Sequence, residues 1–128
     1  MQNIATGKFE IDMTFKDAAG TQIPKIGEAS CDKVFSGELT GNSQGLFLSI
    51  MTDREDSASY VAIETVTGKL NGRHGSFAFL QLGIMDRGQQ HLTYKIVPDS
   101  GTDELIGITG DLKLGDDHHY EISYQLPD

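Results

Sequence analysis

A single carboxylate, Glu64, lies in the middle of the apolar run SYVAIETV at residues 59–66. An ionised carboxylate removed from water is costly unless it finds a hydrogen-bond donor, contacts water or raises its pKa. Such a group either serves a pocket or forms a structural bond with an Arg, Lys or Tyr side chain. We therefore take Glu64 as the candidate catalytic or binding residue, and we keep structural pairing as the alternative.

The dipeptide Asn71-Gly72 follows this run and is the strongest hairpin signal in the chain. A two-residue turn there predicts that Leu70 pairs with Arg73 and that Glu64 pairs with Phe79. Because side chains alternate across a strand, one face of this hairpin carries Tyr60, Ala62, Glu64, Val66, Phe77, Phe79 and Gln81. The other face carries Val61, Ile63, Thr65, Ala78, Leu80, Leu82 and Ile84.

The face with Glu64 mixes aromatic rings with a few polar groups, which is typical of small-ligand pockets. Glu64 is expected to accept a hydrogen bond from a ligand hydroxyl or amine. The predicted ligand-binding residues are Tyr60, Glu64, Phe77, Phe79 and Gln81 from this hairpin, with Tyr120 and Tyr124 from the last strand.

Other reactive side chains carry weaker signals. In DDHHY, residues 116–120, the adjacent His118 and His119 point to opposite faces of a strand and do not easily share a metal ion. Cys31 is the only cysteine and has no CxxC partner, and no GxSxG motif is present. We predict no metal site and no essential cofactor.

The elements that must position these residues are strands. KFEIDMTF at 8–15 and HYEISYQL at 119–126 alternate with a period of two, and about six further short runs lie between them. Turn-like groups such as GNSQG (41–45), LNGR (70–73) and PDSGTD (98–103) separate the runs. Residues 1–128 are therefore predicted to form one all-β domain, a sandwich or a closed antiparallel barrel. An eight-stranded barrel is either filled with side chains or holds one small ligand.

Both faces of the central hairpin are apolar, so each needs cover. In a barrel one face is the interior, and the other would pack against a second subunit or a returning segment; from this we predict a homo-oligomer, most simply a dimer. The net charge of −9 argues against nucleic acid or an anionic membrane as partner. With one cysteine, no signal-peptide pattern and no long apolar run, we expect a cytoplasmic protein.

Four sequence blocks resemble a bacterial family designated domain of unknown function 3224: YVAIE (60–64), GKLNGRHGSF (68–77), VPDSGTDELIGITG (97–110) and HYEISYQL (119–126). The resemblance covers most of the chain. It implies a closed antiparallel barrel similar to that of allene oxide cyclase, whose relatives bind apolar molecules inside the barrel. It implies no reaction, and cyclase chemistry here would rest on fold analogy alone.

The chain departs from the pattern expected for this family at two places. The resemblance implies glycine where this chain has Asp103, and a histidine near Gln81. Without that histidine, an acid–base mechanism that pairs it with Glu64 loses support.

Three functions remain open at this point. The leading hypothesis is an oligomeric barrel that binds a small, partly apolar ligand in its interior. The second is an isomerase or cyclase of the allene-oxide-cyclase type, with Glu64 steering charge. The third is a filled barrel that acts only as a protein–protein interaction module through its apolar outer face.

Overall fold

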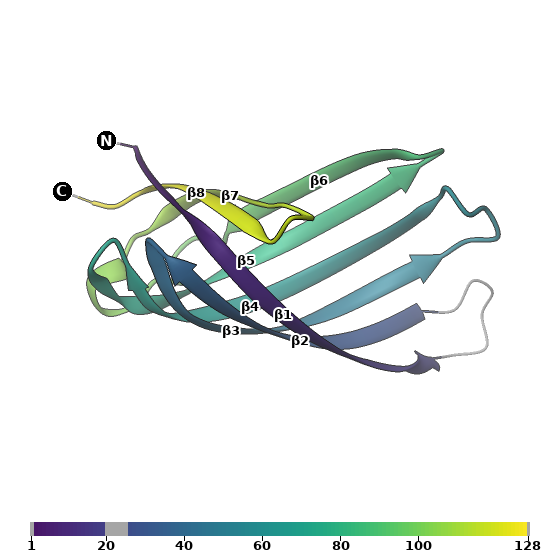
Figure 1. Ribbon diagram of the computed structural model, residues 1–128, viewed down its shortest axis with the longest axis horizontal. Coiled ribbons are helices and arrows are strands. Elements are labelled where there is room, and N and C mark those ends of the chain that lie inside the picture. Colours follow the sequence, from purple (N-terminus) through teal and green to yellow (C-terminus); the bar gives the residue numbers. More distant parts are fainter. Residues whose placement is uncertain (1, 20–25, 128) are drawn as a thin grey trace.

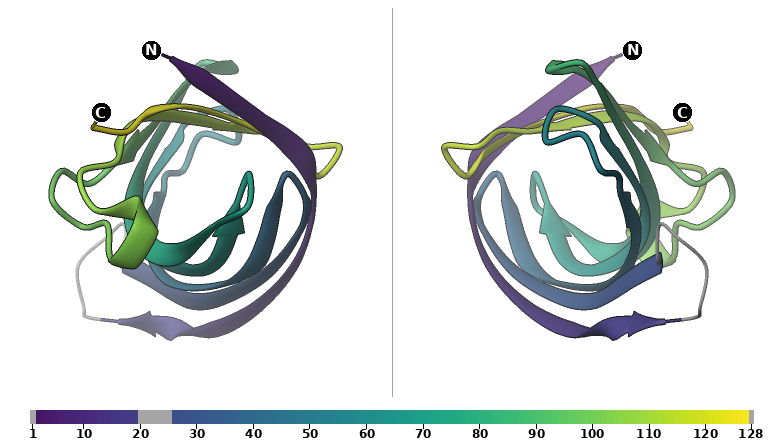
Figure 2. Two further views of the ribbon diagram at one scale, coloured as in Figure 1. Left: turned by 90° about the vertical axis from the view of Figure 1, so that its left-hand side faces the viewer. Right: turned by 90° about the vertical axis from the view of Figure 1, so that its right-hand side faces the viewer.

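The computed structural model describes residues 2–19 and 26–127, which form one closed antiparallel barrel with each strand paired to the next in sequence. Figure 2 shows the ring of strands from its two ends. The prediction of an all-β closed barrel of eight strands is therefore confirmed. The strands are β1 (Asn3–Ala19), β2 (Ile26–Gly37), β3 (Leu39–Met51), β4 (Ala58–Leu70), β5 (Arg73–Asp86), β6 (Gln89–Ile96), β7 (Thr109–Leu114) and β8 (His119–Gln125).

The hairpin between β4 and β5 has the predicted two-residue turn. Asn71 and Gly72 both have positive φ, at 48° and 84°, as a type I′ turn requires. The twist of that turn matches the strands, so pairing runs in register from Leu70–Arg73 through Glu64–Phe79 to Tyr60–Gly83. The side chains predicted to share a face with Glu64 accordingly point into the barrel.

The expected turn at GNSQG (41–45) is wrong, because all five residues lie inside β3. The chain instead reverses at Glu38, next to Gly37 with its φ of 102°. The small and polar residues of this segment have another purpose, since Ser43 is buried and bonds to Glu64 inside the barrel.

The long connection between β6 and β7 closes one end of the barrel with the 3₁₀ turn η1 (Asp103–Leu105). Leu105 and Ile108 are buried there against the core. The backbone N–H of Thr102 donates to the Ser76 carbonyl at 2.9 Å and ties this segment to β5. Asp103 has a φ of 53°, the left-handed conformation that glycine adopts most easily, so the glycine implied here by the family resemblance suits this backbone.

The barrel is closed along only part of its length (Figure 1). β8 pairs with β1 over Asn3–Lys8, although β1 continues to pair with β2 as far as Ala19. β6 meets β7 at a single residue pair, Lys95–Asp111. The strands from β2 to β6 therefore extend beyond β7 and β8, and we call this part the open half and the part near η1 the filled half.

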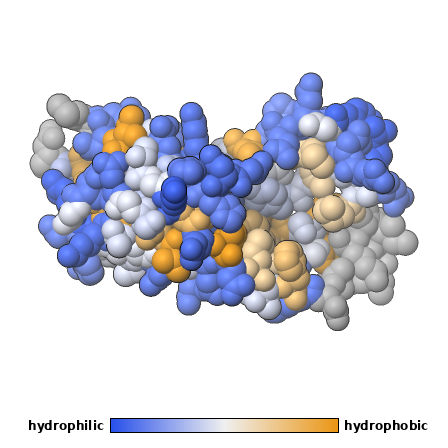
Figure 3. All heavy atoms as spheres, in the orientation of Figure 1, coloured by the Kyte–Doolittle hydropathy of each residue, from blue (hydrophilic) through white to orange (hydrophobic). Residues whose placement is uncertain are grey.

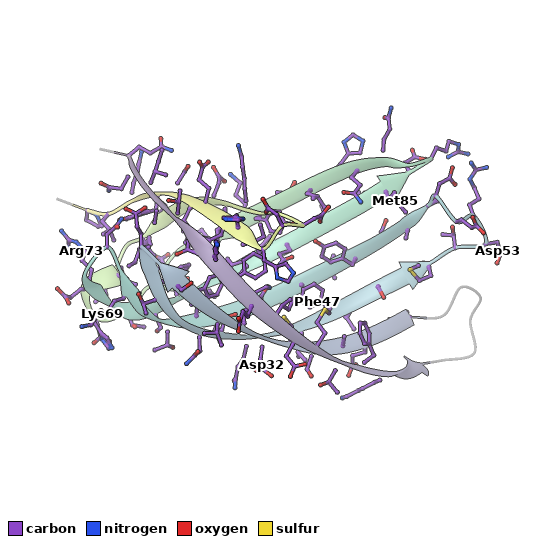
Figure 4. The ribbon with its side chains drawn as sticks, in the orientation of Figure 1. Asp32, Phe47, Asp53, Lys69, Arg73 and Met85 are labelled. Carbon is purple, nitrogen blue, oxygen red and sulfur yellow. The ribbon has the colours of Figure 1, made fainter. Side chains whose placement is uncertain are left out.

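Apolar side chains fill the filled half and form the core. They include Phe9, Phe35, Leu39, Val66, Leu70, Phe77, Phe79, Ile96, Leu105, Ile108, Leu112, Tyr120, Ile122 and Tyr124. In Figure 4, Lys69 and Arg73 mark the filled end, Asp53 and Met85 mark the open end, and Phe47 lies between them. On the face shown in Figure 3, apolar atoms gather near the middle of the long axis. Among the described residues, no helix has the length and apolar character needed to cross a membrane.

Candidate functional site

Glu64 lies fully buried in the interior and has three side-chain partners. The Lys33 ammonium donates to Glu64 Oε2 with an Nζ–Oε2 distance of 2.6 Å, and the Gln81 side-chain amide donates to the same oxygen. The Ser43 hydroxyl donates to Oε1 at 3.1 Å. Lys33, Ser43, Glu64 and Gln81 are all buried, and we call them the polar layer. The charge of Glu64 is thus balanced by an ion pair inside the barrel.

Strand register brings the polar layer together. Lys33 pairs with Ser43 across β2 and β3, and Glu64 pairs with Gly45 across β3 and β4. Gly45 leaves room for the Glu64 side chain, because a Cβ at position 45 would overlap it. The side chain of Glu64 therefore lies across β3 and reaches Lys33 on β2.

The Lys33 ammonium is also surrounded by aromatic rings. Its Nζ lies 5.9 Å from the ring centroid of Phe9, 5.7 Å from that of Phe47 and 5.9 Å from that of Phe79. Rings at this distance attract a cation through their quadrupole. The rings and Glu64 together keep a charged lysine stable in a place where water is largely excluded.

A cavity of about 260 Å³ lies next to the polar layer, where the filled half meets the open half at the turn between β7 and β8. Lys33 and Gln81 contribute its polar floor. Its other walls are Phe9, Ile11, Met13, Phe47, Tyr94, Leu114, Gly115, Asp116 and His118. The cavity thus combines an apolar wall with a few convergent polar groups, the usual composition of a small-ligand site.

One of the seven predicted ligand-binding residues, Gln81, lines this cavity, and Glu64 and Tyr60 are hydrogen-bonded to Gln81 without lining the cavity themselves. Tyr60 donates its hydroxyl hydrogen to Gln81 Oε1 at 3.3 Å and stacks on Phe47, with ring centroids 5.5 Å apart.

The other four predicted residues, Phe77, Phe79, Tyr120 and Tyr124, belong to the packed core and do not line this cavity. Tyr120 accepts a hydrogen bond from the Leu39 N–H at 2.8 Å, and its hydroxyl lies 2.8 Å from the Ser36 carbonyl. Tyr124 accepts one from the Asn71 side-chain amide at 2.7 Å. These two tyrosines hold the turns at the filled end in place.

Ten of the eleven residues that line the cavity were not identified from the sequence, among them Lys33, Phe47 and Tyr94. The sequence did contain a signal for Lys33. In the strand SCDKVF, side chains alternate between the two faces, so Lys33 shares a face with Cys31 and Phe35, and Val34 lies on the other face. The structure buries Cys31, Lys33 and Phe35 and exposes Val34. A lysine on the apolar face of a strand therefore indicated a buried partner for Glu64.

The two adjacent histidines point in different directions. The ring of His118 stacks on Phe9 at the cavity, with centroids 5.2 Å apart. His119 instead lies outside, with its Nδ1 3.3 Å from Asp117 Oδ2. Within residues 2–19 and 26–127, no group of three or more His, Cys, Asp or Glu side chains is placed to hold a metal ion.

The buried phenol and thiol groups give the fold a predicted alkaline limit. Burial raises the pKa of Tyr60 well above its usual value, and its bond to Tyr94 and the Glu64 charge add to this rise. Burial also raises the pKa of Cys31 and of Tyr120. The unfolded chain loses these protons first, so stability is fully present below about pH 9 and falls as pH rises further.

Urea unfolding measured at increasing pH tests this expectation. The free energy of unfolding should decline above about pH 9 and more shallowly in Tyr60→Phe, which has one fewer group to ionise. A stability that stays constant to about pH 11 in the native sequence would contradict the assigned burial of these groups.

Comparison with known proteins gives a family but no activity. The family model described as "Protein of unknown function (DUF3224)" matches residues 5–127. The crystal structure of a protein of unknown function from the DUF3224 family of Shewanella oneidensis MR-1 is similar to this chain, with 41% sequence identity and a TM-score of 0.92. The match covers 100% of this chain and 99% of that one. A search of curated proteins found no match. This chain belongs to the DUF3224 family of proteins of unknown function.

Proposed function

We propose that this protein binds a small, uncharged, partly apolar molecule in the cavity next to the polar layer. The observation that carries the proposal is the position of the polar layer, whose Lys33 and Gln81 form the floor of a cavity that has both apolar walls and the polar side chains of Asp116 and His118. A filled barrel would have no need of buried donors next to an open space. We place this binding in the cytoplasm, which fractionation of the host cell tests.

The charges around the cavity favour a neutral ligand. The Lys33 ammonium is already balanced by Glu64, and Asp116 adds a negative charge to the wall. The chain as a whole carries a net charge of −9. An anionic ligand would therefore meet no unbalanced positive charge in the site, and it would lose its hydration on entry.

The hydrogen bonds favour a ligand that accepts rather than donates. Both oxygens of Glu64 are already bonded to Lys33, Gln81 and Ser43. Lysine carries three N–H donors; Glu64 uses one and the Cys31 thiol is hydrogen-bonded to the same ammonium, so one donor is left for a ligand. The role first expected for Glu64 thus passes to Lys33, with Glu64 as the group that holds Lys33 in position.

Isothermal titration calorimetry with three ligands of similar size tests this ligand class. Acetophenone presents an aromatic body with a carbonyl acceptor, benzoate adds a negative charge, and ethylbenzene lacks the acceptor. We expect acetophenone to bind about tenfold more tightly than either of the other two, a difference of about 1.4 kcal/mol. Met13→Trp should abolish this binding by filling the cavity, and Val34→Trp on the outer surface of β2 should leave it unchanged.

Two results would overturn the proposal. Tighter binding of benzoate would show that the site selects anions, against the charge balance of Lys33 and Glu64. Equal acetophenone binding in Met13→Trp and in the native sequence would place the ligand outside this cavity.

A further inference from the structure

A second apolar surface lies on the outside of the barrel, on the opposite face of the strands that hold the polar layer. Six large aliphatic side chains on β3, β4 and β5 point outward and are between 37% and 61% exposed. We call them the outer leucine face: Leu46, Leu48, Val61, Ile63, Leu80 and Leu82. Their exposed apolar area is on the order of 600 Å², at the upper end of the largest patches on soluble monomers.

Strand register arranges the six residues of this face in two rows across β3, β4 and β5, and each row is symmetric about β4. The first row is Leu46–Ile63–Leu80 and the second is Leu48–Val61–Leu82. In each row a β-branched residue on the middle strand stands between two leucines. The next row, Ile50–Ser59–Ile84, repeats this symmetry with a small residue on β4. The pattern is therefore the same on both sides of β4.

We propose that the outer leucine face binds a second copy of this chain, with a two-fold axis parallel to β4. Such an axis brings the same patch of both copies together. It places Leu46 against the partner's Leu80, Leu48 against the partner's Leu82, and the β4 residues against each other. The symmetry of the rows about β4 makes every one of these contacts apolar.

The shape of the surface suits the same axis. The face is hollowed, with a cavity of about 1060 Å³ that all six residues line. A twisted sheet is saddle-shaped. A rotation of 180° about an axis parallel to its strands gives a second saddle of the same shape, with the outer faces of the two sheets towards each other. This is the geometry by which aligned sheets pack.

Charge at the edges of the face distinguishes this axis from an axis across the strands. Asp32 lies on the β2 side, next to Gln44 in the register, whereas Glu28 on that side is balanced by Lys16, and Lys95 on the β6 side is balanced by Asp111. Rotation about β4 places the β2 edge of one copy towards the β6 edge of the other. Rotation about an axis across the strands would bring the two β2 edges, each with its Asp32 carboxylate, to the same side, which like charges oppose.

The area agrees with a dimer. A stable interface buries about 800 Å² on each partner, with an apolar centre and a polar rim. The outer leucine face supplies the apolar centre, and Ser30, Gln44, Thr65 and Thr93 surround it in the register. An unoccupied apolar face of this size would leave the free chain prone to aggregation.

Sedimentation velocity of the full chain at micromolar concentration tests the dimer. The native sequence should sediment with twice the mass of one chain, and Ile63→Lys should sediment as a monomer with unchanged circular dichroism. Val34→Lys is the matched control, since Val34 is also exposed and points outward but lies on β2 beyond the two leucine rows; it should remain a dimer.

A charge exchange tests the axis itself. Leu46→Lys combined with Leu80→Glu should keep the dimer, because the proposed axis pairs each lysine with the partner's glutamate. Leu46→Lys combined with Leu80→Lys should be monomeric. A monomeric native sequence, a mass unaffected by Ile63→Lys, or a monomer with an apolar molecule or another protein on this face would overturn the proposal. Equal masses for the two double variants would overturn the axis.

Discussion

Glu64→Gln is expected to lower the free energy of unfolding by about 3–5 kcal/mol, because it leaves a buried charge without its counterion. The amide keeps the shape of the side chain and its bond to Ser43, but the Lys33 ammonium, 2% exposed, then has no carboxylate. Lys33→Met should cost a similar amount, since it leaves the carboxylate unpaired. Urea unfolding followed by circular dichroism measures both.

The double variant Lys33→Met/Glu64→Gln separates the ion pair from general damage to the core. Removing both charges removes the desolvation penalty as well as the attraction, so the double variant should be more stable than either single variant. Glu28→Gln is the matched control, because Glu28 forms an exposed ion pair with Lys16 at 2.8 Å, and its loss should change stability by less than about 1 kcal/mol. Costs of the two single changes that simply add would contradict the assigned coupling.

Gly45→Ala is expected to destabilise the fold by about 1–3 kcal/mol, although the change adds one methyl group. The new Cβ would overlap the Glu64 side chain and approach the Ile63 carbonyl oxygen at 2.8 Å. The carboxylate would then have to move away from Lys33, so the cost includes part of the ion pair. Urea unfolding measures the loss.

Gly27→Ala is the comparison that isolates this effect. Gly27 also lies in a strand, and a Cβ there would meet the Ser49 hydroxyl, which is free to rotate away. Its stability should change by less than about 0.5 kcal/mol. If both alanine variants have the same stability, Gly45 does not make room for Glu64, and the account of how the polar layer assembles is wrong.

Turn chemistry explains why part of the site could be predicted from the sequence. Asn71-Gly72 specifies a two-residue turn, and a two-residue turn determines the register of the strands that flank it. From that register, the inward positions of Tyr60, Glu64 and Gln81 follow by alternation alone. These three residues are joined in the structure by direct hydrogen bonds.

The position of a side chain along the barrel axis could not be predicted in the same way. Alternation assigned Tyr120 and Tyr124 to the interior correctly, but it does not say at which level they lie. That level depends on the pairing of β8 with β1, which are far apart in the sequence and pair only over Asn3–Lys8. This short pairing places both tyrosines in the filled half.

Lys33 was missed, and GNSQG was wrongly predicted as a turn, for a related reason. The contact of Lys33 with Glu64 spans β3, and the space for it depends on Gly45. Neither relation is local, so Gly41 and Gly45 gave the same signal as turn glycines. A strand across which a neighbouring side chain lies needs small residues such as Gly45, and small residues are also typical of turns.

Methyl NMR of the protein labelled at methionine tests the central claim, that the cavity next to the polar layer holds the ligand. Met13 lines this cavity, whereas Met51 is 68% exposed at the far end of β3. With acetophenone bound, we expect nuclear Overhauser effects from its ring protons to the Met13 methyl group and none to that of Met51. Effects to Met51 alone, or no effect at Met13 once acetophenone saturates the protein, would contradict the account.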